Sequence, residues 1–150
     1  MKIHTMYADG GAYNNGRKNQ LARICVVHED EVIIHESIGD HTNNEAEFIA
    51  IEKAFEWSTK NIRDGVVAIF SDSKLAVNMI NYIWEGKVER LRELRDRIAG
   101  KLPKNVVVKW IYRDYNKAGQ YLEFNLPRLE QWQRKDILQF QREESTEEKM

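Results

Sequence analysis

Three acidic residues, Asp9, Glu47 and Asp72, stand at positions from which their side chains could act together. Asp9 and Asp72 each follow a short apolar run typical of a strand, and Glu47 lies early in the helical pattern between them. If the two strands are parallel neighbours, their carboxyl ends meet at one edge of a sheet and the three carboxylates converge. Such a cluster is repulsive unless cations lie within it, and Mg²⁺ or Mn²⁺ prefers oxygen ligands. Two ions about 4 Å apart can direct in-line attack on a phosphodiester.

Each of the three acidic residues also has a purely structural explanation. Asp9 precedes two glycines and could cap a turn, while Asp72 could cap the helix that follows it. Glu47 could favour its own helix through the helix dipole. Their joint placement within one order of elements favours the chemical interpretation.

The elements that must position these residues follow from periodicity and turn residues. Strands are predicted over residues 3–8, 21–28, 32–36, 66–71 and 106–111. Helices are predicted over 45–57, from Leu75 to Trp84, in a basic segment ending near Gly100, and from Asn116 through Leu122. The first three strands form an antiparallel meander, and we expect the chain to leave the sheet at Asp9-Gly10-Gly11. This order predicts a mixed sheet covered by helices.

Composition limits the class of protein. The chain has a net charge of −1, with 42% hydrophobic and 31% charged residues, which excludes a fully disordered chain, a collagen-like repeat and a membrane bundle. No apolar run approaches the roughly 20 residues that span a bilayer. The start of the chain lacks the apolar stretch of a signal peptide, so we expect a cytoplasmic protein. A single cysteine, Cys25, allows neither an internal disulfide nor a zinc cage.

Charge is unevenly distributed along the chain. Residues 87–104 carry a net charge of +4, which leaves −5 on the remainder. A basic helix on an acidic body could contact a polyanion. Alternatively, it is a solvated helix whose charges pair with one another.

Three segments resemble type 1 ribonuclease H. They are YADGG at 7–11, TNNEAEFIAI at 42–51 and FSDSKLAV at 70–77. The resemblance covers residues 2–123. It implies the ribonuclease H-like fold, an α/β fold whose five-stranded mixed sheet has three antiparallel strands, then two parallel ones, and flanking helices. The catalytic domain is therefore expected over residues 1–125, with a C-terminal helical extension and frayed tail over residues 126–150.

The same resemblance implies an activity. The family hydrolyses the RNA strand of RNA–DNA hybrids with two Mg²⁺ (or Mn²⁺) ions, and the endonucleolytic products carry 5′-phosphate and 3′-hydroxyl ends. By matched position, Asp9, Glu47 and Asp72 take catalytic and metal-binding roles. We expect a monomer that binds the hybrid and no membrane. Two alternatives stay open: a catalytically silent hybrid-binding module, and another nuclease of this fold, such as a junction resolvase or an exonuclease.

The fourth active-site position departs from the family pattern. The family usually ends with Asn-x-x-Ala-Asp-x-Leu-Ala on its last helix, whereas this chain places Gln120 where the aspartate would stand. Asn116, Gln120 and Glu123 are the candidates to replace it. Asn116 is favoured as a catalytic residue and metal ligand, because its side chain has the length of aspartate and an oxygen that can bind a hard cation. Alternatively, Asn116 only caps the helix. The connection before it, residues 113–115, also lacks the histidine that many members carry.

Four residues match positions that contact the hybrid in the family. Asn15, Asn43 and Asn44 have amides that both donate and accept hydrogen bonds, which suits 2′-hydroxyls and base edges. Thr42 resembles the residue that holds a DNA phosphate. Thr42 or Asn43 could instead serve only to cap the helix.

Overall fold

The computed structural model describes residues 2–125. Its five-stranded mixed sheet has the strand order β3-β2-β1-β4-β5. The strands are β1 (Ile3–Tyr13), β2 (Leu21–His28), β3 (Glu31–Gly39), β4 (Val66–Ser71) and β5 (Val106–Trp110). β1, β2 and β3 pair antiparallel, whereas β4 pairs in parallel with β1 and β5. This confirms the fold class predicted from the sequence, while the expected extension over residues 126–150 lies outside the described residues.

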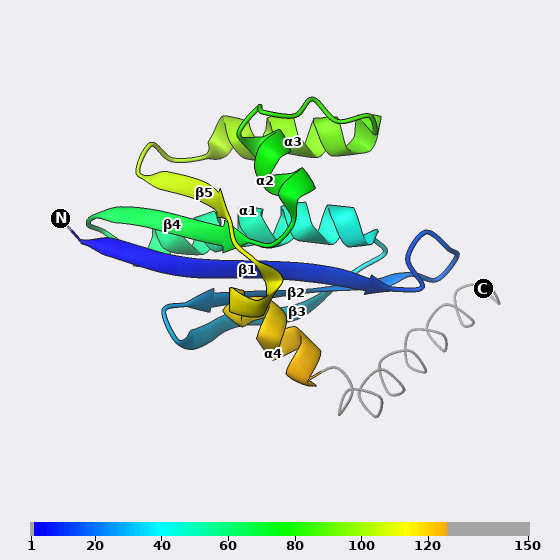
Figure 1. The fold of residues 1–150 in the computed structure, drawn as a ribbon, viewed down its shortest axis with the longest axis horizontal. Coiled ribbons are helices and arrows are strands. Elements are labelled where there is room, and N and C mark those ends of the chain that lie inside the picture. Colours follow the sequence, from blue (N-terminus) through cyan, green and yellow to red (C-terminus); the bar gives the residue numbers. More distant parts are fainter. Residues whose placement is uncertain (1, 126–150) are drawn as a thin grey trace.

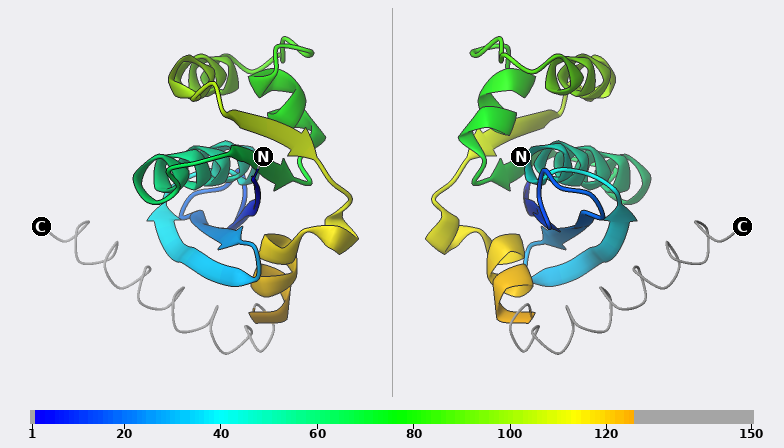
Figure 2. Two further views of the ribbon diagram at one scale, coloured as in Figure 1. Left: turned by 90° about the vertical axis from the view of Figure 1, so that its left-hand side faces the viewer. Right: turned by 90° about the vertical axis from the view of Figure 1, so that its right-hand side faces the viewer.

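Helices cover both faces of the sheet. They are α1 (Asn43–Asn61), α2 (Lys74–Ile80), α3 (Glu89–Lys101) and α4 (Lys117–Asn125), with a 3₁₀ turn over Arg113–Tyr115. α1, α2 and α3 lie on one side of the sheet, and α4 lies on the other (Figures 1 and 2). Within residues 2–125, no helix is long and apolar enough to cross a membrane.

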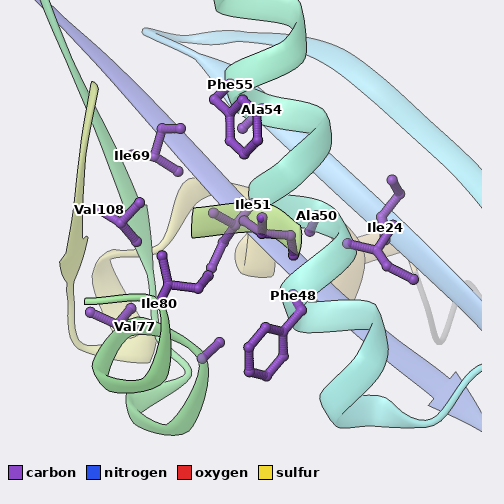
Figure 3. Packing of buried hydrophobic residues seen from close by; sticks show 14 of the residues in the cluster. Ile24, Phe48, Ala50, Ile51, Ala54, Phe55, Ile69, Val77, Ile80 and Val108 are labelled. Carbon is purple, nitrogen blue, oxygen red and sulfur yellow. The ribbon is translucent and has the colours of Figure 1, made fainter. Parts of the chain in front are cut away.

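The main core lies between α1 and the sheet. Phe48, Ile51 and Phe55 of α1 are buried there, together with Ile69 of β4 and Val108 of β5 (Figure 3). Each buried side chain of this size contributes roughly 1.5–3 kcal/mol through removal from water. The core therefore fixes α1 against the strands that carry the acidic residues.

β1 extends further than the sequence predicted. The chain does not leave the sheet at Asp9-Gly10-Gly11, because β1 continues to pair with β2 as far as Tyr13. Its parallel pairing with β4 does end earlier, at Tyr7 opposite Phe70. The glycines thus do not form a turn. An ideal Cβ on Gly10 would lie 2.5 Å from the backbone of Ala46, so glycine permits a close approach of α1.

The helix expected to reach Trp84 is shorter than predicted, since α2 ends at Ile80. The side-chain amide of Asn81 donates to the carbonyl of Val108 on β5, and Tyr82 adopts a φ of 57°. A left-handed residue cannot continue an α-helix. Trp84 consequently lies outside the helix and is 44% exposed.

Candidate active site

The structure brings Asp9, Glu47 and Asp72 together. Asp9 lies within β1, Glu47 in the second turn of α1, and Asp72 directly after β4. One carboxylate oxygen from each lies within 4.8 Å of the others. The parallel pairing of β1 with β4 sets the distance between the two aspartates, as the sequence predicted. Within residues 2–125, this acidic cluster contains only these three side chains.

The start of α1 holds Glu47 against β1. Thr42 caps α1, with its side-chain oxygen accepting from the Glu45 N–H, and the Glu45 carboxylate accepts from the Thr42 N–H in return. This reciprocal capping box fixes the first turn of the helix. Gly10 then allows Ala46 to touch β1, which brings the next residue, Glu47, beside Asp9.

The charges of the cluster are strongly coupled. Burial, followed by the charge of Asp72, raises the pKa of Asp9 from 3.8 to about 7. Burial also raises the pKa of Glu47 well above its ordinary value, with the charges of both aspartates adding to the effect. Burial raises the pKa of Asp72 as well, although the positive charge of Arg113 opposes this. The three carboxylates are therefore costly to ionise together without a nearby cation.

The donor set fits a hard divalent cation. Glu47 Oε2 is buried and has no hydrogen-bond partner within the described residues. A buried charged oxygen without a partner is expensive, and a bound cation would satisfy it. Oxygen ligands alone, with two or more carboxylates, suit Mg²⁺ or Mn²⁺ better than metals that prefer nitrogen or sulfur.

Asn116 is fully buried and caps α4. Its side-chain oxygen faces the N–H groups of Ala118 and Gly119, at 3.1 and 3.4 Å. Its amide nitrogen donates to the carbonyl of Ala8, at 3.1 Å. The Asn116 side chain also forms a hydrogen bond with the Asp72 carboxylate, which lowers the pKa of that group, so Asn116 lies beside the acidic cluster. The structure therefore shows that Asn116 caps α4, and its role as a metal ligand stays a prediction.

The other two candidates for the fourth position are both exposed. The side-chain amide of Gln120 donates to the carbonyl of Asp114, and Glu123 lies on the surface of α4. Gly119 instead faces the cluster, because an ideal Cβ there would lie 3.4 Å from Asp9 Oδ2. α4 thus approaches Asp9 with a residue that has no side chain.

Two of the four residues expected to contact the hybrid, Asn15 and Asn43, are joined by a hydrogen bond near the end of β1. The Asn43 N–H donates to Asn15 Oδ1, at 2.7 Å. Asn43 Oδ1 accepts from the N–H of Ala12, and Thr42 precedes Asn43 as the helix cap. Asn44 is exposed beside them. These bonds show that Thr42 and Asn43 have structural roles, and they place the group one helical turn from Glu47.

One positively charged residue near the carboxylates, Arg113, was not predicted from the sequence. Arg113 lies on the 3₁₀ turn between β5 and α4, and its charge lowers the pKa of both Asp9 and Asp72. The available signal was its position as the basic residue of the β5–α4 connection, where many family members carry a histidine.

Most arginines of the basic segment, residues 87–104, form ion pairs or hydrogen bonds with other groups of the protein. Arg97 forms a two-point ion pair with the buried Glu52, at 2.8 and 3.1 Å. The buried Arg95 donates to Asp96 and to the carbonyl of Glu85. For these two residues, the structure favours the alternative of internal pairing. The segment's three lysines are exposed, at positions 87, 101 and 104.

Comparisons with known proteins agree on one family. A family model described as RNase H matches residues 1–120. LC11-RNase H1, solved in complex with an RNA/DNA hybrid, is 30% identical over 75% of this chain and 88% of its own, with a TM-score of 0.61. A second structure of LC11-RNase H1, isolated from compost, is 26% identical over 81% of this chain and 93% of its own, with a TM-score of 0.64. RNase H1 from Halobacterium salinarum is 20% identical over 81% of this chain and 94% of its own, with a TM-score of 0.60. No curated protein matches the sequence.

Proposed function

Because the chain belongs to the RNase H family, we propose that it is an endoribonuclease that hydrolyses the RNA strand of RNA–DNA hybrids. The observation that carries this proposal is the convergence of Asp9, Glu47 and Asp72 within 4.8 Å. The similarity to LC11-RNase H1, which was solved with such a hybrid, supports the choice of substrate.

The three carboxylates would hold two divalent cations, Mg²⁺ or Mn²⁺. When bound, such ions supply an activated water and stabilise the charge on the departing 3′-oxygen, which gives 5′-phosphate products. The chain's own residues provide the conditions for this chemistry. Glu47 offers a buried oxygen without a partner among the described residues, and Arg113 brings a fixed positive charge close to Asp9 and Asp72.

The surface formed by Asn15, Thr42, Asn43 and Asn44 would bind the hybrid beside the carboxylates. Asn43 and Glu47 lie four residues apart on α1, so they share one face of the helix. A strand that contacts Asn43 therefore lies within reach of the cluster. Amide groups that donate and accept suit the 2′-hydroxyls of the RNA strand.

One assay tests this proposal directly. Purified protein is incubated with an end-labelled RNA–DNA hybrid, duplex RNA or duplex DNA, each with Mg²⁺, Mn²⁺ or a chelator. We expect cleavage of the RNA strand of the hybrid alone, dependent on the divalent ion and lost in Asp72→Asn. Hybrid binding without cleavage under every metal condition would support a silent binding module instead. Cleavage of duplex DNA would favour another nuclease of this fold.

A further inference from the structure

A second group of metal-ligating side chains lies toward the start of β1. His4 on β1, His28 at the end of β2 and Glu29 in the following turn each offer a ligand atom, and these atoms lie within 4.8 Å of one another. His4 and Asp9 are five residues apart on β1, which corresponds to about 16 Å along a strand. The group is therefore separate from the carboxylate cluster.

The two imidazoles already have the spacing of zinc ligands. His4 Nδ1 lies 3.3 Å from His28 Nε2. Two nitrogens bound to one tetrahedral zinc at about 2.0–2.1 Å lie roughly 3.3–3.4 Å apart. Glu29 Oε1, which accepts from the Thr5 N–H, lies 3.9 Å from the same nitrogen of His28 on a half-exposed side chain.

A hydrogen bond to His4 determines which of its ring nitrogens can bind a metal. His4 Nε2 lies 3.2 Å from the backbone carbonyl of Asp64. A carbonyl only accepts, so Nε2 carries the proton and Nδ1 presents its lone pair to His28. A ring N–H held by a backbone carbonyl is the usual outer-shell partner of a metal-bound histidine.

The sheet and α1 hold the other two ligands in place. Met6 pairs with His28 across β1 and β2, so His4 and His28 lie on the same face of the sheet. The ring of Trp57 on α1 packs against His28, with centroids 5.0 Å apart. The Thr5 N–H donates to the Glu29 carboxylate, which fixes the turn next to the two rings.

We propose that His4, His28 and Glu29 form a zinc site that ties β1 to the β2–β3 turn. Two imidazoles and one carboxylate favour Zn²⁺ over Mg²⁺, which prefers oxygen ligands. The hydrogen bond between the two rings is broken on binding, and the proton on His28 Nε2 moves to its Nδ1. A site assembled from two strands exists only in the folded chain, so zinc bound there stabilises the fold.

Zinc titration of the full-length protein tests this site. Imidazole ¹⁵N shifts are followed by NMR and thermal unfolding by calorimetry, with saturating Mg²⁺ present to compete at the carboxylates. We expect one equivalent of Zn²⁺ to shift the resonances of His4 and His28 and to raise the melting temperature. His28→Gln and the more exposed Glu29→Gln should each weaken this binding by at least about tenfold.

Two control variants make the result decisive. His41→Gln removes a histidine next to Glu45 at the start of α1, and it should bind zinc as the wild type does. Asp72→Asn should lose hybrid cleavage but keep the zinc-induced shifts, which separates this site from the proposed nuclease activity. Unchanged His4 and His28 resonances, or equal zinc affinity in the wild type, His28→Gln and Glu29→Gln, would show that the rings form only a hydrogen-bonded pair.

Discussion

The side-chain amide of Asn116 donates a hydrogen bond to the carbonyl of Ala8, which ties the start of α4 to the residue before Asp9. The oxygen of the same amide caps α4. One buried side chain therefore sets the distance between the last helix and the central strand. Its position beside the carboxylates makes Asn116 a positioning residue.

Asn116→Ala should destabilise the protein without changing its metal requirement. The loss of the cap costs about 1 kcal/mol, and the unpaired carbonyl of Ala8 adds roughly 1–3 kcal/mol. Asn116→Asp keeps the acceptor for the cap but loses the donor to Ala8 and adds a negative charge beside Asp72, so it should be no more stable than Asn116→Ala at neutral pH. Thermal unfolding and the Mg²⁺ midpoint for cleavage measure the two effects. Gln120→Ala, at an exposed position, serves as the control. If Asn116→Ala shifted the Mg²⁺ midpoint but kept wild-type stability, Asn116 would be a metal ligand.

When a chelator keeps the protein free of metal, the carboxylate cluster should make the free energy of unfolding fall as the pH rises from about 4 to 7. Asp9 ionises near 3.8 in the unfolded chain and near 7 in the folded one. Between these values the folded state holds the extra proton, so the contribution of Asp9 to stability decreases as the pH rises, by about 1.4 kcal/mol for each pH unit in this interval. Thermal unfolding of the wild type and of Asp9→Asn, compared across this range, isolates the effect.

Asp72→Asn should raise the stability of the metal-free protein at pH 7, because it removes a charge that opposes the ionisation of Asp9. The same change should reduce cleavage by more than the roughly 100-fold typical of outer-shell substitutions. Parallel pH dependences of the wild type and Asp9→Asn, with no gain from Asp72→Asn, would contradict this account of the cluster.

Arg97→Gln should act mainly on folding. Glu52 is 6% exposed, and its carboxylate depends on the two-point contact with Arg97. An ionised group left buried without its partner costs about 2 kcal/mol or more. Chemical denaturation measures this loss, and the double variant Arg97→Gln with Glu52→Gln should recover part of it.

The exposed lysines of the same segment should act on substrate binding instead. Replacing Lys87 and Lys101 with Gln should raise KM for the hybrid. The slope of its salt dependence should fall by about one for each phosphate that a lysine no longer neutralises. The melting temperature should change little, since both side chains lie in solvent. An unaltered KM across salt concentrations would confine the segment to a structural role.

Gly10→Ala should disturb the site through the backbone. The added Cβ would lie 2.5 Å from the carbonyl carbon and oxygen of Ala46, so the start of α1 has to shift. Overpacking of this kind costs typically about 1–3 kcal/mol, and the shift moves Glu47 away from Asp9. Gly11→Ala is the matched control, because its Cβ would meet Asn43 Oδ1 at an ordinary 3.8 Å. Gly10→Ala should therefore have a lower cleavage rate and a lower melting temperature than Gly11→Ala. Equal rates and melting temperatures in the two variants would rule out the close contact between Gly10 and Ala46.

The sequence could predict the acidic cluster because strand ends and helix starts leave local signals. Asp72 follows an apolar run directly, and the sheet order then determines its neighbour, Asp9. The role of Asn116 left no such signal, since its partner Ala8 lies 108 residues away in the chain. A cap and a metal ligand require the same residue types, so only the tertiary contact distinguishes them.

The two misplaced element ends have a similar explanation. Asp-Gly-Gly indicates a turn in local terms, but pairing with β2 carries β1 through it. The apolar pattern up to Trp84 indicates a longer helix, yet the contact of Asn81 with β5 ends α2 earlier. In both cases a neighbouring strand overrides a local preference.

The parallel pairing of β1 with β4 also determines when the proposed activity can arise during synthesis. Translation delivers β1, β2 and β3 first, and these strands pair through short connections. Asp72 joins Asp9 only after the long α1 connection has closed, and Asn116 reaches Ala8 later still. A nascent chain that has emerged only as far as α1 therefore lacks part of the acidic cluster. The proposed nuclease activity would therefore require a chain in which β4 has already emerged and paired with β1.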